Sequence, residues 1–190
     1  MTEDPQYNPA WPLYMAMDFG WWNNFIGWLQ PSGNGDRVVM LYVDYQEMRT
    51  NEENAKLALA TLQARGYGQL TGGCGYSSKP TALRAYSQVF GVEILGAPGR
   101  VENGQELVKQ WLKAALMTKG ASGLSFSRQC PKRLFQEMQG YREHVPGTGP
   151  HHSLDAPRYF FIRVGRSMTM SASEPPWGYK KKREVGAVVG

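Results

Sequence analysis

Cysteine is scarce in this chain, and long apolar runs are missing. The two cysteines, Cys74 and Cys130, lie far apart and belong to no C-x-x-C pair, so neither a disulfide framework nor a zinc site is expected. No apolar run approaches the roughly 20 residues needed to cross a bilayer, and the first residues lack the basic-then-apolar order of a signal peptide. We therefore expect a protein of a reducing cytosol that is not secreted and has no membrane partner.

Charged residues are also few, at 19% of the chain, and they are unevenly placed. The formal net charge is +5, and much of the excess lies in one run near the C-terminus, formed by Lys180, Lys181, Lys182 and Arg183. Such a run suits a polyanionic partner. It is equally typical of a solvated tail.

Length and hydrophobic content predict one globular domain. A chain of 190 residues, 42% of them hydrophobic, can bury a sizeable core. Residues 1–12 are polar, aromatic and proline-bearing, which indicates an N-terminal segment rather than a packed element. Periodicity is lost beyond residue 166. We expect the domain over residues 13–166 and a basic, flexible tail over 167–190.

The hydrophobic pattern predicts three antiparallel strands followed by alternating helices and strands. Apolar runs over 13–17, 25–29 and 38–45 indicate the three strands, with an obvious turn at 31–36. Helical spacing and caps then favour helices over 51–65, 80–90, 103–116 (capped by Asn103), 131–141 and about 153–164, the last with Pro157 in its first turn. Shorter runs over 69–73, 92–95 and 124–126 favour strands. Together these describe an α/β fold, a mixed sheet with helices on both faces.

Two carboxylates stand where a strand and a helix meet their loops. Asp18 ends the first strand, where it is either a turn residue or a ligand for a hard divalent cation. Asp155 opens the last helix, where it either faces the positive end of the helix dipole or shares that cation. Nearby, His151 and His152 could be metal ligands, proton shuttles, phosphate contacts or plain surface. Arg158 could bind phosphate or form an internal salt bridge.

The third strand offers two further acids, Asp44 and Glu47. Side chains alternate along a regular strand, so residues three apart cannot both face the same way. One of the two is therefore expected to be solvated. We slightly favour Glu47 as a third catalytic acid because it lies where the strand should end, and Asp44 remains an alternative.

Four motifs lie between residues 13 and 164. They are Met17-Asp18-Phe19-Gly20, the helix opening Asn103-Gly104-Gln105-Glu106, Leu124-Ser125-Phe126 with the helix after it, and the closing His152-Ser153-Leu154-Asp155-Ala156-Pro157-Arg158-Tyr159, which is similar to an H-x-x-D-A-x-R-Y signature. Over roughly residues 13–164 these motifs resemble one known family, the C-terminal nuclease domain of phage terminase large subunits, which has an RNase H-like fold.

The resemblance implies a metal-dependent DNA endonuclease with little sequence specificity. Asp18 and Asp155 match the family's acids that bind catalytic Mg²⁺ or Mn²⁺, in a suspected two-ion site. The family's middle acid normally follows the fourth strand, but this chain reads Thr71-Gly72-Gly73-Cys74-Gly75-Tyr76-Ser77-Ser78 there, without a carboxylate. His151 takes a place where many relatives have an acid.

The resemblance also implies partners. Double-stranded DNA would be cut as a concatemer in the host cytoplasm, in company with a terminase ATPase domain or subunit, the small terminase subunit and the portal. The chain has no G-x-x-x-x-G-K-[ST] phosphate loop, so it should not hydrolyse ATP.

Two other functions compete with this one. The missing middle acid and the aromatic residues Trp21, Trp22 and Trp177 would suit a catalytically weakened or inactive module that binds DNA or docks on the packaging machinery. A junction-resolving nuclease of the same fold would need a stable dimer and branched DNA, and the sequence supports neither.

Overall fold

The computed structural model describes residues 4–20, 23–47, 49–76, 78–97, 101–140 and 152–165. Within these residues six strands form one mixed sheet in the order β5-β4-β1-β2-β3-β6. The strands are β1 (Tyr14–Phe19), β2 (Asn23–Pro31), β3 (Arg37–Glu47), β4 (Gly72–Tyr76), β5 (Ile94–Ala97) and β6 (Gly123–Phe126). Pairing is antiparallel for β1–β2 and β2–β3 and parallel for the other neighbours. The predicted meander and the mixed sheet are confirmed.

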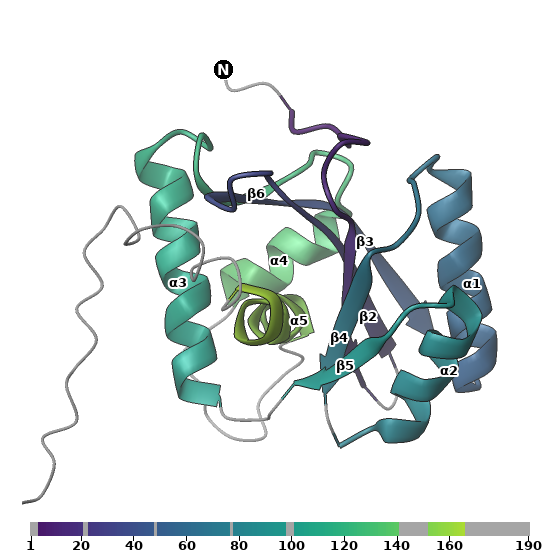
Figure 1. Ribbon diagram of the computed structural model, residues 1–190. Helices are drawn as coiled ribbons and strands as arrows, with labels where there is room; N and C mark the ends of the chain where they lie inside the picture. Colours follow the sequence, from purple (N-terminus) through teal and green to yellow (C-terminus); the bar gives the residue numbers. More distant parts are fainter. Residues whose placement is uncertain are drawn as a thin grey trace, which may run out of the picture.

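Helices cover both faces of the sheet, as predicted. Helices α1 (Asn51–Ala64) and α2 (Pro80–Phe90) lie on one face, and α3 (Val101–Met117), α4 (Lys132–Gly140) and α5 (His152–Phe160) lie on the other (Figure 1). A π-helical turn, η1 (Phe161–Gly165), continues α5. Among the described helices, none is both long enough and apolar enough to span a bilayer.

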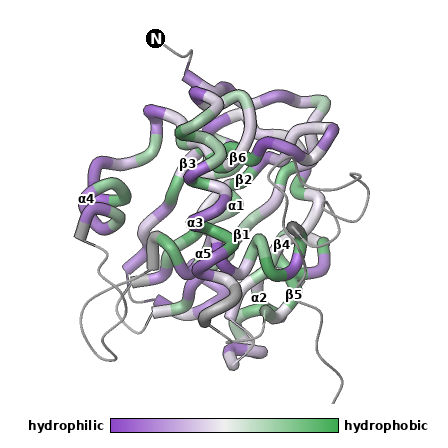
Figure 2. Tube along the Cα trace, turned by 90° about the vertical axis from the view of Figure 1, so that its left-hand side faces the viewer, coloured by the Kyte–Doolittle hydropathy of each residue, from purple (hydrophilic) through white to green (hydrophobic). Residues whose placement is uncertain are grey.

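The sheet separates two hydrophobic clusters because side chains alternate along each strand. One cluster joins the sheet to α3, α4 and α5, and the other joins it to α1 and α2. In Figure 2 green hydrophobic stretches follow the central strands, whereas purple hydrophilic stretches concentrate on the outer elements. We call the first face the α5 face and the second the α1 face.

The N-terminal segment packs on the domain although it forms no regular element in its described part. The buried Gln30 side chain donates to the carbonyl oxygens of Asn8 and Trp11 at 2.6 and 3.0 Å. The Tyr7 hydroxyl accepts from the Gly68 amide at 2.8 Å. This segment is therefore held at the α1 face.

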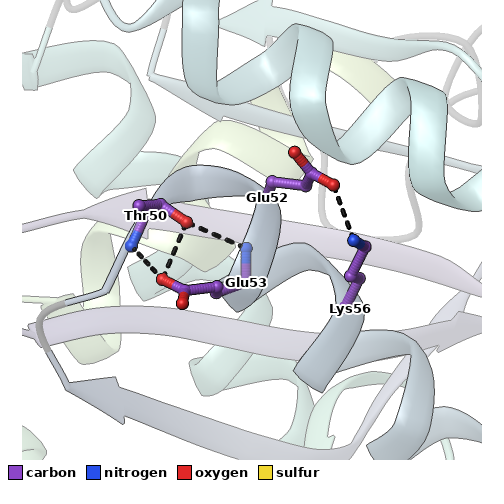
Figure 3. A network of polar contacts seen from close by, with 4 residues as sticks. All are labelled: Thr50, Glu52, Glu53 and Lys56. Atoms are coloured by element: carbon purple, nitrogen blue, oxygen red, sulfur yellow. Dashed lines mark hydrogen bonds and ion pairs between the residues drawn. The ribbon is translucent and has the colours of Figure 1, made fainter.

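Helix α1 begins at a capping box that fixes the end of the β3–α1 connection. Thr50 Oγ1 accepts from the Glu53 amide at 3.2 Å, and the Glu53 carboxylate accepts from the Thr50 amide at 2.9 Å (Figure 3). The Glu53 carboxylate also accepts from Thr50 Oγ1 at 2.8 Å, and the two hydrogen bonds that this exposed carboxylate accepts lower its pKa. One turn on, Glu52 pairs with Lys56 at 2.6 Å on the solvent side. The predicted start of this helix is confirmed.

Three sequence-based boundaries were wrong. A strand was expected over 69–73, but the observed strand β4 lies three residues later. From Gly73 onward the β4 backbone pairs with both β1 and β5, which fixes its position. There a Cβ on Gly73 would lie 2.8 Å from the carbonyl oxygen of Met15, so close approach rather than β propensity selects the residue. Asn103 lies inside α3 rather than capping it, since the helix starts at Val101. The strand expected over 92–95 is β5, two residues later.

The last helix also differs from the expectation. It starts at His152, so Pro157 falls in its second turn, where it removes one backbone hydrogen bond. The helix accommodates the proline, and the π-helical turn η1 begins four residues after it, whereas the sequence predicted an unbroken helix to 164.

Candidate active site

Asp18 lies on the α5 face at the end of β1. Tyr14 and Ala16 pack in the α5-face cluster, whereas Met15 and Met17 pack in the other. By this alternation Asp18 points to the α5 face, where its side chain is 9% exposed. Strand β1 has a paired neighbour on each side, β2 and β4, so the backbone under this carboxylate is fixed by the sheet.

Helix α5 lies across β1 and β4 and brings Asp155 to the same place. The Tyr14 and Phe160 rings meet edge-on with centroids 5.8 Å apart. The Tyr76 and Tyr159 rings stack with centroids 5.8 Å apart and planes 11° apart. Asp155 and Tyr159 are four residues apart in this helix and therefore lie on one side of it.

The two carboxylates act on one hydroxyl group. Burial raises the pKa of Tyr159, and the negative charges of Asp18 and Asp155 raise it further, while the Arg158 guanidinium opposes them. Asp18 from β1 and Asp155 from α5, which are 137 positions apart in the sequence, thus both lie near enough to Tyr159 to raise its pKa. With its pKa raised, the Tyr159 hydroxyl stays protonated through the neutral range.

Arg158 forms an internal salt bridge, one of the two roles that the sequence left open. Its Nη2 lies 2.9 Å from Asp155 Oδ1 and donates to Tyr159 Oη at 3.1 Å. The Arg158 side chain is 4% exposed and the Asp155 side chain 26% exposed. Asp155 is thus held by a buried partner while its own side chain stays partly exposed.

Space for the Arg158 side chain depends on Gly104 of α3. A Cβ on Gly104 would lie 2.8 Å from Arg158 Cδ, 2.8 Å from Ile162 Cδ1 and closer still to Arg158 Cγ. Such separations are below those that real Cβ atoms show, so no other residue fits without moving the arginine. From the sequence this glycine was noted only as part of a helix opening, and the space it leaves for Arg158 was not predicted.

The end of β4, beside Asp18, carries an aromatic residue. The parallel pairing runs from Tyr14 with Gly72 to Met17 with Gly75. Continuing that register by one residue sets Tyr76 beside Asp18, with its ring stacked on Tyr159. The strand itself, Gly-Gly-Cys-Gly-Tyr, contributes no carboxylate. The sequence could show the missing acid but not the tyrosine stack, because it did not reveal the register.

The structure does not bring Asp44 to this site. The β2–β3 register shifts between Trp28, which pairs with Tyr42, and Leu29, which pairs with Met40. A residue inserted in this way moves all later side chains to the other face. Asp44 therefore lies on the α1 face, where its carboxylate accepts from Thr61 Oγ1 at 3.0 Å.

Glu47 lies on the α5 face, at the exposed end of β3. Asp18 pairs with Phe25 of β2, and Phe25 pairs with Tyr45 of β3. Glu47 therefore lies two strands away from Asp18 across the sheet and two residues further along β3. Strand spacing and rise place the two Cα atoms about 12 Å apart. At that separation Glu47 is poorly placed to share one ion with Asp18 directly.

Several predicted site residues lie outside the described part of the chain. These are His151, the side chain of His152, and the basic run Lys180, Lys181, Lys182 and Arg183. Trp21, Trp22 and Trp177 also lie outside it. Their suggested roles stay predictions.

Asp18 and Asp155 fit a divalent cation. Mg²⁺ and Mn²⁺ prefer oxygen ligands, and two packed elements, β1 and α5, each present one carboxylate on this face, Asp18 buried and Asp155 partly exposed. A richer metal site is not found in the described residues, which contain no group of three or more His, Cys, Asp or Glu side chains able to hold an ion.

A shallow groove lies elsewhere, on the α1 face, and neither Asp18 nor Asp155 lines it. Arg65 fills part of it, with its Cζ 3.1 Å from the centroid of the Tyr42 ring and its Nη1 donating to Gln129 at 2.9 Å. Its lining is formed by Tyr42, Thr61, Ala64, Arg65 and Gln129. The groove contains no acid that could bind a metal.

No protein-family model matches the chain, and no curated protein matches its sequence. Solved structures do match. The large terminase nuclease domain of P22 superposes with a TM-score of 0.61 over 88% of this chain and 91% of its own, at 16% identity. The Mn-bound nuclease domain of the g2p large terminase of bacteriophage SPP1 gives 0.54 over 80% and 86%, at 14% identity. The human cytomegalovirus terminase nuclease domain gives 0.51 over 80% and 84%, at 8% identity.

This chain has the fold of a large-terminase nuclease domain. The resemblance inferred from the sequence is thus confirmed at the level of the fold, including its RNase H-like mixed sheet. Two of the matching structures, from SPP1 and from the thermophilic phage G20c, are described with bound Mn and Mg respectively. In our structure the large-terminase nuclease fold places Asp18 and Asp155 together where β1 and α5 meet.

Proposed function

We propose that this chain is the metal-dependent DNA endonuclease domain of a phage DNA-packaging terminase large subunit. The observation that carries the proposal is the placement of Asp18 and Asp155 on the α5 face where α5 packs on β1, within the fold of terminase nuclease domains. Mg²⁺ or Mn²⁺ held by these two carboxylates would activate a water molecule and stabilise the leaving oxygen of a phosphodiester.

The protein's own residues have separate tasks in this proposal. Asp18 presents a carboxylate from a strand that cannot move, because β1 is paired on both sides. Asp155 is oriented by its ion pair with Arg158. Tyr159 remains a neutral hydrogen-bonding hydroxyl because burial and two carboxylates raise its pKa. Glu47, on the same face at the exposed end of β3, assists from the substrate side rather than as a shared ligand.

We propose double-stranded viral DNA as the substrate, cut in the host cytoplasm with little sequence preference. Phosphate contacts carry affinity without reading bases, so binding should weaken steeply with salt. The basic run from Lys180 to Arg183 is proposed to grip the backbone, and His151 and His152 to lie at its phosphates. The ATPase domain or subunit, the small subunit and the portal are the proposed protein partners.

Nicking of supercoiled plasmid in Mg²⁺, and separately in Mn²⁺, tests this function. We expect the wild type to nick DNA and both Asp18→Asn and Asp155→Asn to abolish nicking. Asp36→Asn is a matched control, because Asp36 caps the Ser32 turn beyond the far end of β3. Glu47→Gln is expected to slow nicking without abolishing it.

A second function is favoured by one observation, the absence of a carboxylate on β4. If the folded wild type binds DNA in a salt-dependent way but does not nick it in either metal, the domain is a DNA-binding or docking module instead.

A further inference from the structure

We infer that this site takes a single divalent cation, and that the Arg158 guanidinium supplies the positive charge that a second ion would otherwise bring. The inference rests on the proposed function, because it concerns the same two carboxylates. It replaces the two-ion site that the family resemblance favours with a site of one metal ion and one fixed organic cation.

The first argument is the burial of Arg158. A guanidinium is charged at every accessible pH and is costly to bury unless it is paired. At 4% exposure, Arg158 directs only Nη2 to partners, Asp155 Oδ1 and Tyr159 Oη. Its Nε and Nη1 are buried and have no hydrogen-bond partner among the described residues. A full positive charge is therefore fixed beside the carboxylates and only partly satisfied.

The second argument is charge balance at the site. Asp18 and Asp155 contribute two negative charges and Arg158 one positive charge, which leaves a net charge of −1 on these three side chains. One divalent ion would change that to +1. Two ions would leave +3 in a largely buried place, and the second ion would also be repelled by the guanidinium.

The third argument is the shape of the site on the β4 side. Tyr76 occupies the position beside Asp18 from which a third carboxylate could reach the ion. The Tyr76 ring is stacked on the Tyr159 ring, with the centroids 5.8 Å apart. The stack occupies the place beside Asp18. Strand β4, as far as the structure describes this side, offers no carboxylate to a second ion.

The fourth argument is that Arg158 is confined to its place. Gly104 leaves room for the stem of Arg158, and the Arg158 Cζ lies 4.7 Å from the centroid of the Tyr159 ring. Helix α3 covers one side of the arginine and the tyrosine covers another. The guanidinium cannot swing out to admit an ion without breaking its bond to Asp155.

Counting Mn²⁺ ions tests the inference without using nuclease activity. The full chain is titrated with Mn²⁺ by calorimetry, with free Mn²⁺ followed by electron paramagnetic resonance, in the absence of DNA. The difference in bound Mn²⁺ equivalents between the wild type and Asp18→Asn gives the number of ions held at this site, apart from any Mn²⁺ bound elsewhere on the chain. We expect one equivalent to be lost, and a loss of two would overturn the inference.

Arg158 is then tested by a pair of substitutions that separates charge from packing. Arg158→Lys keeps the positive charge, and we expect its Mn²⁺ affinity to stay close to that of the wild type. Arg158→Gln keeps a hydrogen-bond donor but removes the charge, so its Mn²⁺ affinity should rise by on the order of tenfold. Equal affinities in the wild type and both variants would refute the role of Arg158, and a merely structural arginine would shift both variants alike.

The failure of the proposed function would look different. If the folded wild type bound no Mn²⁺ in a manner that depends on Asp18 or Asp155, the metal-dependent nuclease itself would be excluded. Circular dichroism and thermal melting identify any variant that has not folded. Should Arg158→Gln not fold, the number of equivalents bound by the wild type still decides between one ion and two.

Discussion

Replacing Gly104 by alanine should reduce stability, although alanine normally favours helices. In an exposed helix interior, Gly→Ala is worth about 1 kcal/mol of added stability. Here the new Cβ meets Arg158 Cδ and Ile162 Cδ1 at 2.8 Å, and Arg158 Cγ at a shorter distance. Overpacking of this kind costs about 1–3 kcal/mol. We expect the upper part of that range, because the stem of Arg158 is confined by its ion pair with Asp155.

The net effect is then a loss of about 1–2 kcal/mol, from the overpacking cost less the helix preference. For a chain of this size it corresponds to a fall in Tm of about 2–8 °C. Urea unfolding of the wild type and Gly104→Ala at neutral pH measures the difference in free energy directly. The matched control is Gly33→Ala, because nothing lies within 4 Å of a Cβ at Gly33. Gly33→Ala should leave the free energy of unfolding unchanged or raise it slightly. If the Gly104→Ala protein were as stable as the Gly33→Ala protein, the contact with Arg158 would be refuted.

Three further predictions concern the folded chain. Burial raises the pKa values of the Cys74 and Cys130 thiols to about 12. Only the unfolded thiols ionise between about pH 9 and 12, so the free energy of unfolding should be unaffected below about pH 9 and fall as the pH rises above it. Urea titrations at pH 8 and 10 should show this fall, and Cys74→Ala should show less of it. Thr50→Ala removes the hydrogen bonds of Thr50 Oγ1 with the Glu53 amide and carboxylate but keeps the one donated by the Thr50 amide; it should cost about 1 kcal/mol in urea unfolding, and no loss would argue against the cap. Tyr76→Asp adds a carboxylate beside Asp18 and brings the three acids and Arg158 to a net charge of −2, which one divalent ion neutralises. The Mn²⁺ equivalents lost on Asp18→Asn should therefore stay at one, with a higher affinity than in the wild type and in Tyr76→Phe, and a second equivalent in a folded Tyr76→Asp protein would contradict the charge balance.

The elements with strong local signals were predictable from the sequence. Helix α1 has a capping residue, helical spacing and Gly66 after its last turn, and the structure places it over Asn51–Ala64. Helix α2 ends at Gly91, whose φ of 66° is the left-handed conformation that favours glycine at a helix end. The order of strands and helices, and hence the mixed sheet, follows from such signals. Asp18 and Asp155 were singled out as candidates because one lies near the end of a strand and the other in the first turn of a helix.

The remaining features depend on contacts between distant segments. Strand β4 is rich in glycine because its neighbours approach closely, and β propensity therefore misplaced it by three residues. The irregularity between Trp28 and Leu29 decides which third-strand acid faces α5. No property of Asp44 or Glu47 reveals that irregularity, because it arises from the pairing of β2 with β3. The sequence could therefore leave only two alternatives open.

Arg158 combines a local sequence signal with contacts between distant segments. Its spacing of three residues from Asp155 allows a salt bridge on any helix surface, where such a pair would add little to stability. The packing of α5 against β1, β4 and α3 instead buries the guanidinium, which lies beside Asp155 and the Tyr159 hydroxyl. A residue that would be a minor surface contact on an isolated helix thus becomes a fixed charge at the candidate site. For this reason the number of acids is an incomplete guide to the metal content of the site, and the cation already present has to be counted with them.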